Sequence, residues 1–125
     1  MEFKDKVVIV TGGANGIGRS LCVAFANAGA KVAVVDLETN PASDVAELVG
    51  GIGLRADVAI EKDIQTMVAE VESSLGPVDI FVSNAGISFG DGPGWMAASA
   101  PDEAWETSWK VNVMAHVYAA RVEIG

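Results

Sequence analysis

The 125 residues suffice for one domain, and a chain that is half hydrophobic and one-fifth charged has the composition of a globular protein with a packed core. A net charge of −9 argues against nucleic acids and anionic membranes as partners, because both attract Lys and Arg. The single cysteine excludes an internal disulfide, and the sequence shows neither a signal-peptide pattern nor an apolar run long enough to span a bilayer. We therefore expect a cytoplasmic protein.

Strands and helices are predicted to alternate along the chain. Short apolar, β-branched runs predict strands over 6–11, 31–36, 52–58 and 78–82. Apolar residues at helical spacing predict helices over 17–28, 41–49 and 60–75, and a last helix from about 101 to 125. Residues 84–100 form a long predicted loop, a length more typical of functional loops. The alternation predicts a three-layer α/β/α fold around a doubly wound parallel sheet.

A glycine-rich turn follows the first predicted strand, with the sequence Thr11-Gly12-Gly13-Ala14-Asn15-Gly16-Ile17-Gly18. Glycine permits a tight turn and lets a pyrophosphate approach the backbone, while the unpaired N–H groups of the next helix attract phosphate. Ligands of open parallel sheets bind beyond the carboxyl ends of the strands, where this turn lies. The predicted phosphate contacts are Gly12, Asn15, Gly16, Ile17 and Gly18.

An acidic residue closes the second predicted strand. Asp36 stands eighteen residues after Gly18, and Leu37 follows it. A carboxylate in this place accepts hydrogen bonds from the hydroxyls of an adenosine ribose and repels a 2′-phosphate. Leu37 adds no positive charge, and Arg19 is the cation nearest in sequence to the turn. NAD is therefore the expected cofactor rather than NADP.

The spacing Thr-Gly-x-x-x-Gly-x-Gly resembles the glycine motif of the short-chain dehydrogenase/reductase family. Further matches occur in the family's order: Asp57-Val58 after the third strand, Ser83-Asn84-Ala85-Gly86 after the fourth, and Asn112 in the last helix. The resemblance covers about residues 4–121. It implies an NAD-dependent oxidoreductase with a Rossmann fold of strand order 3-2-1-4, which interconverts a small alcohol and a carbonyl compound by hydride transfer.

The resemblance also implies individual roles. Asp57 and Val58 would flank the adenine, the run Asn84-Ala85-Gly86 would face the nicotinamide ribose, and Asn112 would hold a water in a proton relay. Ser83 stands where the family has asparagine and cannot donate two amide hydrogens, so we expect an altered hydrogen-bond network there. Without the other motifs, Asp57 is as typical of an ordinary turn as of an adenine site. The Asn-Ala-Gly run is likewise typical of a tight backbone turn.

The family's catalytic Tyr-x-x-x-Lys pair is not found in this sequence. Tyr118 lies within the last predicted helix and is followed four residues later by Val122. His116, the one histidine, has no second ligand at a credible spacing, and no metal site is predicted. We expect 1–125 to be an incomplete NAD-binding domain, truncated after the fourth strand and its helix and inactive in isolation. An open strand edge would favour a homo-oligomer.

Two alternative functions remain at this point. One is a non-catalytic nucleotide-binding or interaction module that is complete at 125 residues. The other is an S-adenosylmethionine-dependent methyltransferase, which also uses a glycine-rich loop and an acid after the second strand. Thr11 and the Asn-Ala-Gly run fit that alternative poorly. The identity of the substrate is not predicted, because specificity resides in the loop after Gly86 and in segments absent from this sequence.

Overall fold

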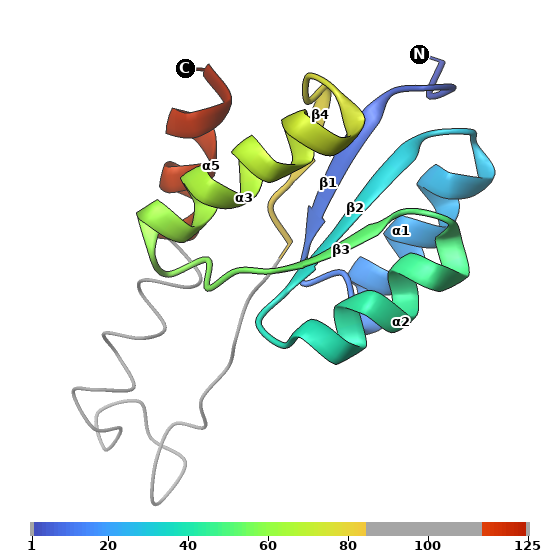
Figure 1. Ribbon diagram of the computed structural model, residues 1–125, viewed down its shortest axis with the longest axis horizontal. Coiled ribbons are helices and arrows are strands. Elements are labelled where there is room, and N and C mark those ends of the chain that lie inside the picture. Colours follow the sequence, from blue (N-terminus) through green and yellow to red (C-terminus); the bar gives the residue numbers. More distant parts are fainter. Residues whose placement is uncertain (1, 85–113, 125) are drawn as a thin grey trace, which may run out of the picture.

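The computed structural model describes residues 2–84 and 114–124, which form a four-stranded sheet with helices on both faces (Figure 1). The strands are β1 (Val7–Thr11), β2 (Lys31–Asp36), β3 (Ile52–Arg55) and β4 (Ile80–Val82). The helices are α1 (Gly16–Asn27), α2 (Thr39–Val49), α3 (Glu61–Leu75) and α5 (Ala115–Ile124). All pairings are parallel and the order is β3-β2-β1-β4, which confirms the predicted doubly wound Rossmann fold.

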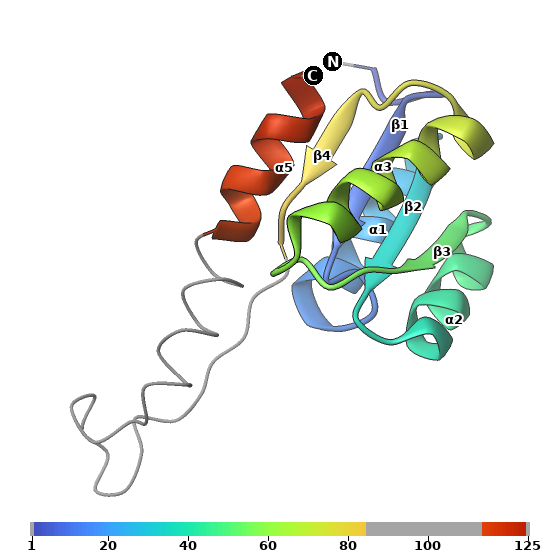
Figure 2. The ribbon, with the colours of Figure 1, turned by 60° about the vertical axis from the view of Figure 1, so that its left-hand side comes forward.

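Alternate residues of β1 pack into two separate apolar clusters, one on each face of the sheet. Val7 and Ile9 pack toward α3, whereas Val8 and Val10 pack toward α1 and α2. The strand is buried along its whole length, which explains why its sequence is continuously apolar instead of alternating. Figure 2 shows α3 and α5 side by side on one face, with α1 and α2 on the other.

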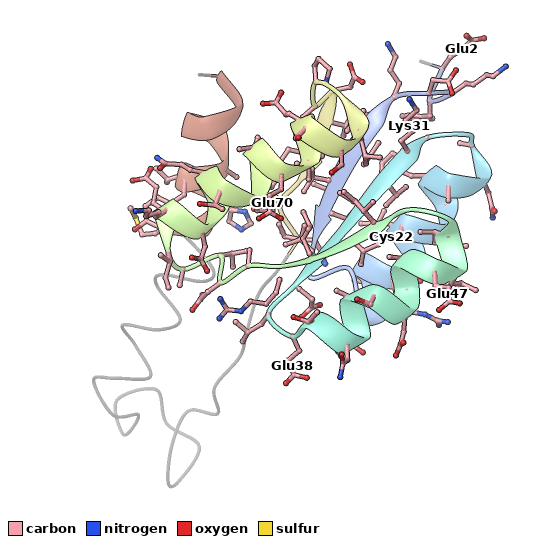
Figure 3. All side chains as sticks on the ribbon, viewed as in Figure 1. Glu2, Cys22, Lys31, Glu38, Glu47 and Glu70 are labelled. Carbon is pink, nitrogen blue, oxygen red and sulfur yellow. The ribbon has the colours of Figure 1, made fainter. Side chains whose placement is uncertain are left out.

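The two helix layers carry their charged residues on the outside. Figure 3 shows Glu47 on α2 and Glu70 on α3, both exposed, whereas Cys22 of α1 is fully buried against the sheet. Part of the acidic excess of the sequence therefore lies on solvated helix surfaces. In the described ranges, no helix has both the length and the apolar character needed to cross a membrane.

Helix α2 begins earlier than predicted. Its first residue is Thr39, so Pro41 lies inside the first turn instead of opening the helix. Proline is tolerated there because the first N–H groups of a helix have no partner within it. The helix ends, as predicted, at Gly50, whose φ of 68° is the left-handed conformation that glycine adopts at low cost.

Strands β3 and β4 are shorter than predicted, and an aspartate carboxylate is hydrogen-bonded to the backbone near each shortened end. β3 ends at Arg55 because the Asp57 carboxylate accepts a hydrogen bond from the N–H of Ala59 (3.0 Å), which turns the chain. β4 begins at Ile80, next to Asp79, whose carboxylate accepts from the N–H of Val7 (2.9 Å) and whose own N–H donates to the carbonyl of Val7 (3.0 Å). The predicted loop from 85 onward and the last helix before residue 114 lie outside the described residues; the described part, α5, is helical as predicted.

Candidate functional site

The carboxyl ends of β1, β2 and β4 bring the predicted phosphate turn together with two other predicted residues. The N–H of Ala14 in the turn donates to the Asp36 carboxylate (3.1 Å), and the side-chain amide of Asn84 donates to the carbonyl of Gly12 (3.4 Å). The N–H of Gly13 donates to the carbonyl of Val35 (3.1 Å). Contacts with β2 on one side and β4 on the other therefore set the position of the glycine loop, residues 12–18.

Gly18 is required by the close approach of three segments. A Cβ at this position would overlap the carbonyl oxygen of Gly12 and lie 2.7 Å from the amide nitrogen of Asn84. A neighbouring glycine, Gly16, has a φ of 55° and open space around it, so it is selected for its conformation rather than for room. The loop therefore folds back on the start of α1 with only backbone atoms at the closest contact.

The N-terminus of α1 is free of the groups that usually neutralise a helix end. Asn15 occupies the N-cap in an extended conformation and makes no side-chain capping hydrogen bond, and the first turn contains no acidic residue. The first N–H groups of a helix carry a partial positive charge and lack partners within the helix. Together with the Gly18 approach, this arrangement fits a phosphate group bound by the backbone of residues 16–18.

Asp36 connects the end of β2 to the glycine loop. One carboxylate oxygen accepts from the N–H of Ala14, and the other accepts from the N–H of Leu37 (2.8 Å). Asp36 itself is half-buried. Each carboxylate oxygen can accept a second hydrogen bond, so the group keeps capacity for the hydroxyls of a ligand. The apolar side chains nearby are open to solvent: Leu37 is 54% exposed and Ile17 in the glycine loop is 74% exposed.

Thr11 holds the end of β4 against the loop. Its hydroxyl, buried at 1% exposure, donates to the carbonyl of Val82 (3.3 Å) and accepts from the N–H of Asn84 (3.0 Å). The amide of Asn84 is thereby turned toward Gly12. In the sequence Thr11 stands out only as the first residue of the glycine motif. A hydroxyl at the end of an otherwise apolar strand was the signal for this second role.

The turn after β3 contains contacts that were not predicted from the sequence. The N–H of Asp57 donates to the carboxylate of Asp63 (2.9 Å), and the same oxygen of Asp63 lies 3.3 Å from a guanidinium nitrogen of Arg55. A second nitrogen of Arg55 donates to the carbonyl of Leu37 (3.2 Å). Val58, predicted to flank the adenine, is 8% exposed. Because Arg55 pairs with Asp36 in the β2–β3 register, the parallel sheet itself was the available signal for Arg55.

Ser83 has a partner on the last helix. Its hydroxyl is hydrogen-bonded to Nδ1 of the exposed His116 at 2.5 Å, which joins the end of β4 to α5. The two residues are 33 positions apart, and no sequence pattern pairs them. Tyr118 is half-buried against the cluster beneath α3. Ala85, Gly86 and Asn112 lie outside the described residues.

The family is decided by comparison with known proteins. Residues 6–123 match the family model of the short chain dehydrogenases. The chain belongs to the short-chain dehydrogenase family. An uncharacterized oxidoreductase of Thermotoga maritima is 40% identical over 92 residues, which cover 70% of this chain and 36% of that protein. The mitochondrial borneol dehydrogenase of Lavandula x intermedia is 39% identical over 87 residues, which cover 70% of this chain and 34% of that protein.

A solved structure agrees with this assignment over nearly the whole chain. The putative short-chain dehydrogenase of Novosphingobium aromaticivorans superposes with a TM-score of 0.89 at 28% identity, covering 98% of this chain and 46% of that one. The chain thus spans about a third of the length of the curated relatives named above. Members of this short-chain dehydrogenase family bind a nicotinamide cofactor, NAD or NADP.

Proposed function

We propose that this chain is the cofactor-binding part of an NAD(H)-dependent oxidoreductase that interconverts an alcohol and a carbonyl compound. The observation that carries the proposal is the position of the Asp36 carboxylate, held by the N–H groups of Ala14 and Leu37 beside the glycine loop. A negative charge there accepts hydrogen bonds from ribose hydroxyls and repels a 2′-phosphate, which favours NAD over NADP.

The residues of the proposed site have separate tasks. The glycine loop and the N-terminus of α1 hold the pyrophosphate through backbone N–H groups, and Asp36 holds the adenosine ribose. Asp57 and Val58 border the adenine, while the run 84–86 borders the nicotinamide ribose. Asn112 supports proton transfer through a water. The bound nicotinamide supplies the hydride chemistry, and the protein supplies position.

The proposed substrate class is a small alcohol or the corresponding carbonyl compound. A curated relative that is 39% identical over 87 residues is named a borneol dehydrogenase, and this name supports an alcohol as substrate. The sequence has one tyrosine, Tyr118, and position 122 is valine where a Tyr-x-x-x-Lys pair would have lysine. We therefore propose that these 125 residues bind the cofactor but do not turn over substrate by themselves.

Calorimetric titration with NAD⁺ and NADP⁺ tests the proposal. We expect measurable binding of NAD⁺, at least tenfold weaker binding of NADP⁺, and a reduced preference in Asp36→Asn. Asparagine at this position keeps an acceptor oxygen but loses the charge that repels a 2′-phosphate. Tighter binding of NADP⁺ by the wild type would overturn the NAD assignment. Binding of S-adenosylmethionine in place of both dinucleotides would support a methyltransferase instead.

We also propose that the chain self-associates through β4. Among the described strands β4 lies at the end of the sheet, with β1 as its neighbour. An unpaired strand edge presents backbone N–H and C=O groups that pair readily with another chain. Sedimentation at micromolar concentration should give a dimer or larger species. A homogeneous monomer would contradict this proposal and leave the cofactor assignment intact.

A further inference from the structure

A guanidinium group lies beside the proposed ribose site. Arg55 ends β3 directly opposite Asp36 of β2, and its Nε donates to the carbonyl of Leu37 (3.2 Å), the residue that follows Asp36. Its side chain is 50% exposed. An arginine close to the adenosine ribose is the usual means of binding a 2′-phosphate, because its fork of N–H groups matches phosphate oxygens. At this position the positive charge of Arg55 would favour NADP, whereas the proposed role of Asp36 is to favour NAD.

Arg55 forms a salt bridge with Asp63 of helix α3. Asp63 lies in the first turn of α3, and its Oδ2 is 3.3 Å from Nη1 of Arg55. The same oxygen accepts the N–H of Asp57 at 2.9 Å, which ties the carboxylate to the turn after β3. Asp63 is the less exposed partner, at 29%. Because the backbone fixes the position of the Asp63 carboxylate, Asp63 can in turn fix the position of the longer Arg55 side chain.

The two contacts of Arg55 point its guanidinium in one direction. Nε is bound to the carbonyl of Leu37 and Nη1 to Asp63, so the fork is directed from β2 toward α3. Without the carboxylate, the group would keep its charge and its place beside Leu37 but lose the partner that draws it toward α3. Rotation about its outer torsions would then turn its remaining N–H groups toward a phosphate on the ribose.

We propose that Asp63 is a specificity-determining residue, which restrains Arg55 and so preserves the preference for NAD that Asp36 establishes. This inference rests on the proposed function, because it concerns the same dinucleotide site. In the proposed complex Asp63 contacts no part of the cofactor. It acts through Arg55 and is a positioning residue, and its removal should change the selectivity for NAD over NADP rather than affinity in general.

The variant Asp63→Asn separates the two roles of Asp63. Asparagine keeps an oxygen that accepts the N–H of Asp57, so the turn after β3 is maintained, while the negative charge that engages Arg55 is lost. The matched controls are Arg55→Gln and the double variant Asp63→Asn/Arg55→Gln. Dissociation constants for NAD⁺ and NADP⁺ are measured by calorimetry at low and high salt, and circular dichroism checks that each variant is folded.

The ratio of the two dissociation constants is the decisive quantity. We expect Asp63→Asn to bind NADP⁺ about twofold more tightly, a gain within the range for an exposed ion pair, with NAD⁺ affinity little changed. The gain should vanish in the double variant and decrease at high salt, because it depends on the charge of Arg55. Arg55→Gln alone should not gain affinity for NADP⁺.

Two results would overturn the inference, and they differ from failure of the proposed function. If Asp63→Asn weakens both dinucleotides equally, Asp63 only supports the turn at Asp57. If NADP⁺ affinity rises equally in the double variant, Arg55 is not the group that is released. If the wild type binds neither dinucleotide, the proposed function itself is wrong and the inference is rejected with it.

Discussion

The glycine loop and the contacts around Arg55 border the same proposed site but are held in opposite ways. At Gly18 the backbone packs so closely that no side chain fits. Around Arg55, by contrast, exposed charged side chains hold the turn after β3. A contact made by backbone shape tolerates almost no substitution, whereas a contact between solvated charges can be exchanged at small cost. We infer that the first region provides binding as such and the second adjusts which dinucleotide is preferred.

The largest expected effect is that of Gly18→Ala. Its Cβ would overlap the carbonyl of Gly12 and crowd Asn84, so either the loop or the start of α1 must move. We expect a loss of about 3 kcal/mol or more in the free energy of unfolding and no detectable dinucleotide binding. Urea unfolding and calorimetry measure the two effects.

Gly50→Ala is the matched control for this substitution. The substitution at Gly50 also replaces a hydrogen by a methyl group. Gly50 has a φ of 68°, and no atom lies within contact distance of the added Cβ. Only the conformational cost should remain, about 1 kcal/mol, and dinucleotide binding should be unchanged. Equal stability losses in the two variants would show that packing at Gly18 is not the limiting factor.

The next effect concerns Cys22, which lies beneath the glycine loop with its Sγ 3.9 Å from the carbonyl of Gly13. Burial raises the pKa of the Cys22 thiol from 9.0 to about 11. Its thiolate population at pH 8 is therefore about a hundredfold lower than that of an unperturbed thiol. We expect very slow reaction with a thiol reagent in the native protein and rapid reaction in urea. Fast native reaction would mean that the loop region opens readily.

The same pKa shift predicts the pH dependence of stability. The unfolded chain loses the Cys22 proton near pH 9, whereas the folded chain retains it to about pH 11. Deprotonation therefore favours the unfolded state in this interval, and the free energy of unfolding should fall as the pH rises from 9 to 11. Cys22→Ala should lack this component of the decline. An identical decline in that variant would assign it to other groups.

A moderate effect is expected for Asn84→Ala, which removes the hydrogen bond from its side-chain amide to the carbonyl of Gly12 (3.4 Å). The free energy of unfolding should fall by about 1 kcal/mol, and dinucleotide affinity should fall because the loop loses its tie to β4. Asn15→Ala is the matched control for stability, since the Asn15 side chain makes no capping hydrogen bond. Its change should stay within about 0.5 kcal/mol. A larger loss in Asn15→Ala than in Asn84→Ala would contradict this ranking.

The smallest expected effect is the loss of stability when the exposed ion pair between Arg55 and Asp63 is removed. Arg55→Ala should change the free energy of unfolding by less than about 0.5 kcal/mol, because solvent screens a pair whose side chains are 50% and 29% exposed. Asp63→Ala should cost more, about 1 kcal/mol, since the N–H of Asp57 also loses its acceptor. Urea unfolding measures both changes in the free energy of unfolding. Equal losses in Arg55→Ala and Asp63→Ala would contradict a separate contribution from the hydrogen bond between Asp57 and Asp63.

The sequence predicted the parts of the fold that depend on local pattern. Continuous apolar runs marked the strands, the alternation of strands with helices predicted a parallel sheet, and the family resemblance supplied the strand order that the structure has. Asp36 was placed correctly at the end of β2 because a strand end is visible in the sequence. The start of α2 was wrong because Pro41 is as acceptable within the first turn as at the first residue.

Contacts between distant elements could not be predicted in the same way. The pairs Arg55–Asp63 and Ser83–His116 join separate elements through exposed side chains, and each residue taken singly resembles any other solvated polar group. Only the register of the sheet, which sets Arg55 opposite Asp36, provided a clue. The proposed effect of Asp63 on selectivity is therefore harder to derive from the sequence than the preference attributed to Asp36, because it depends on side chains whose partners are set by tertiary structure.

The most direct test of the account is the location of the dinucleotide in solution. Backbone amide resonances of the isotopically labelled chain are followed by NMR during titration with NAD⁺. We predict that the largest shifts occur in residues 12–18, at Asp36 and Leu37, and at Asn84, with smaller shifts at Asp57 and Val58. Shifts confined to another face of the molecule, or none at saturating NAD⁺, would contradict the assignment of this edge of the sheet as the cofactor site.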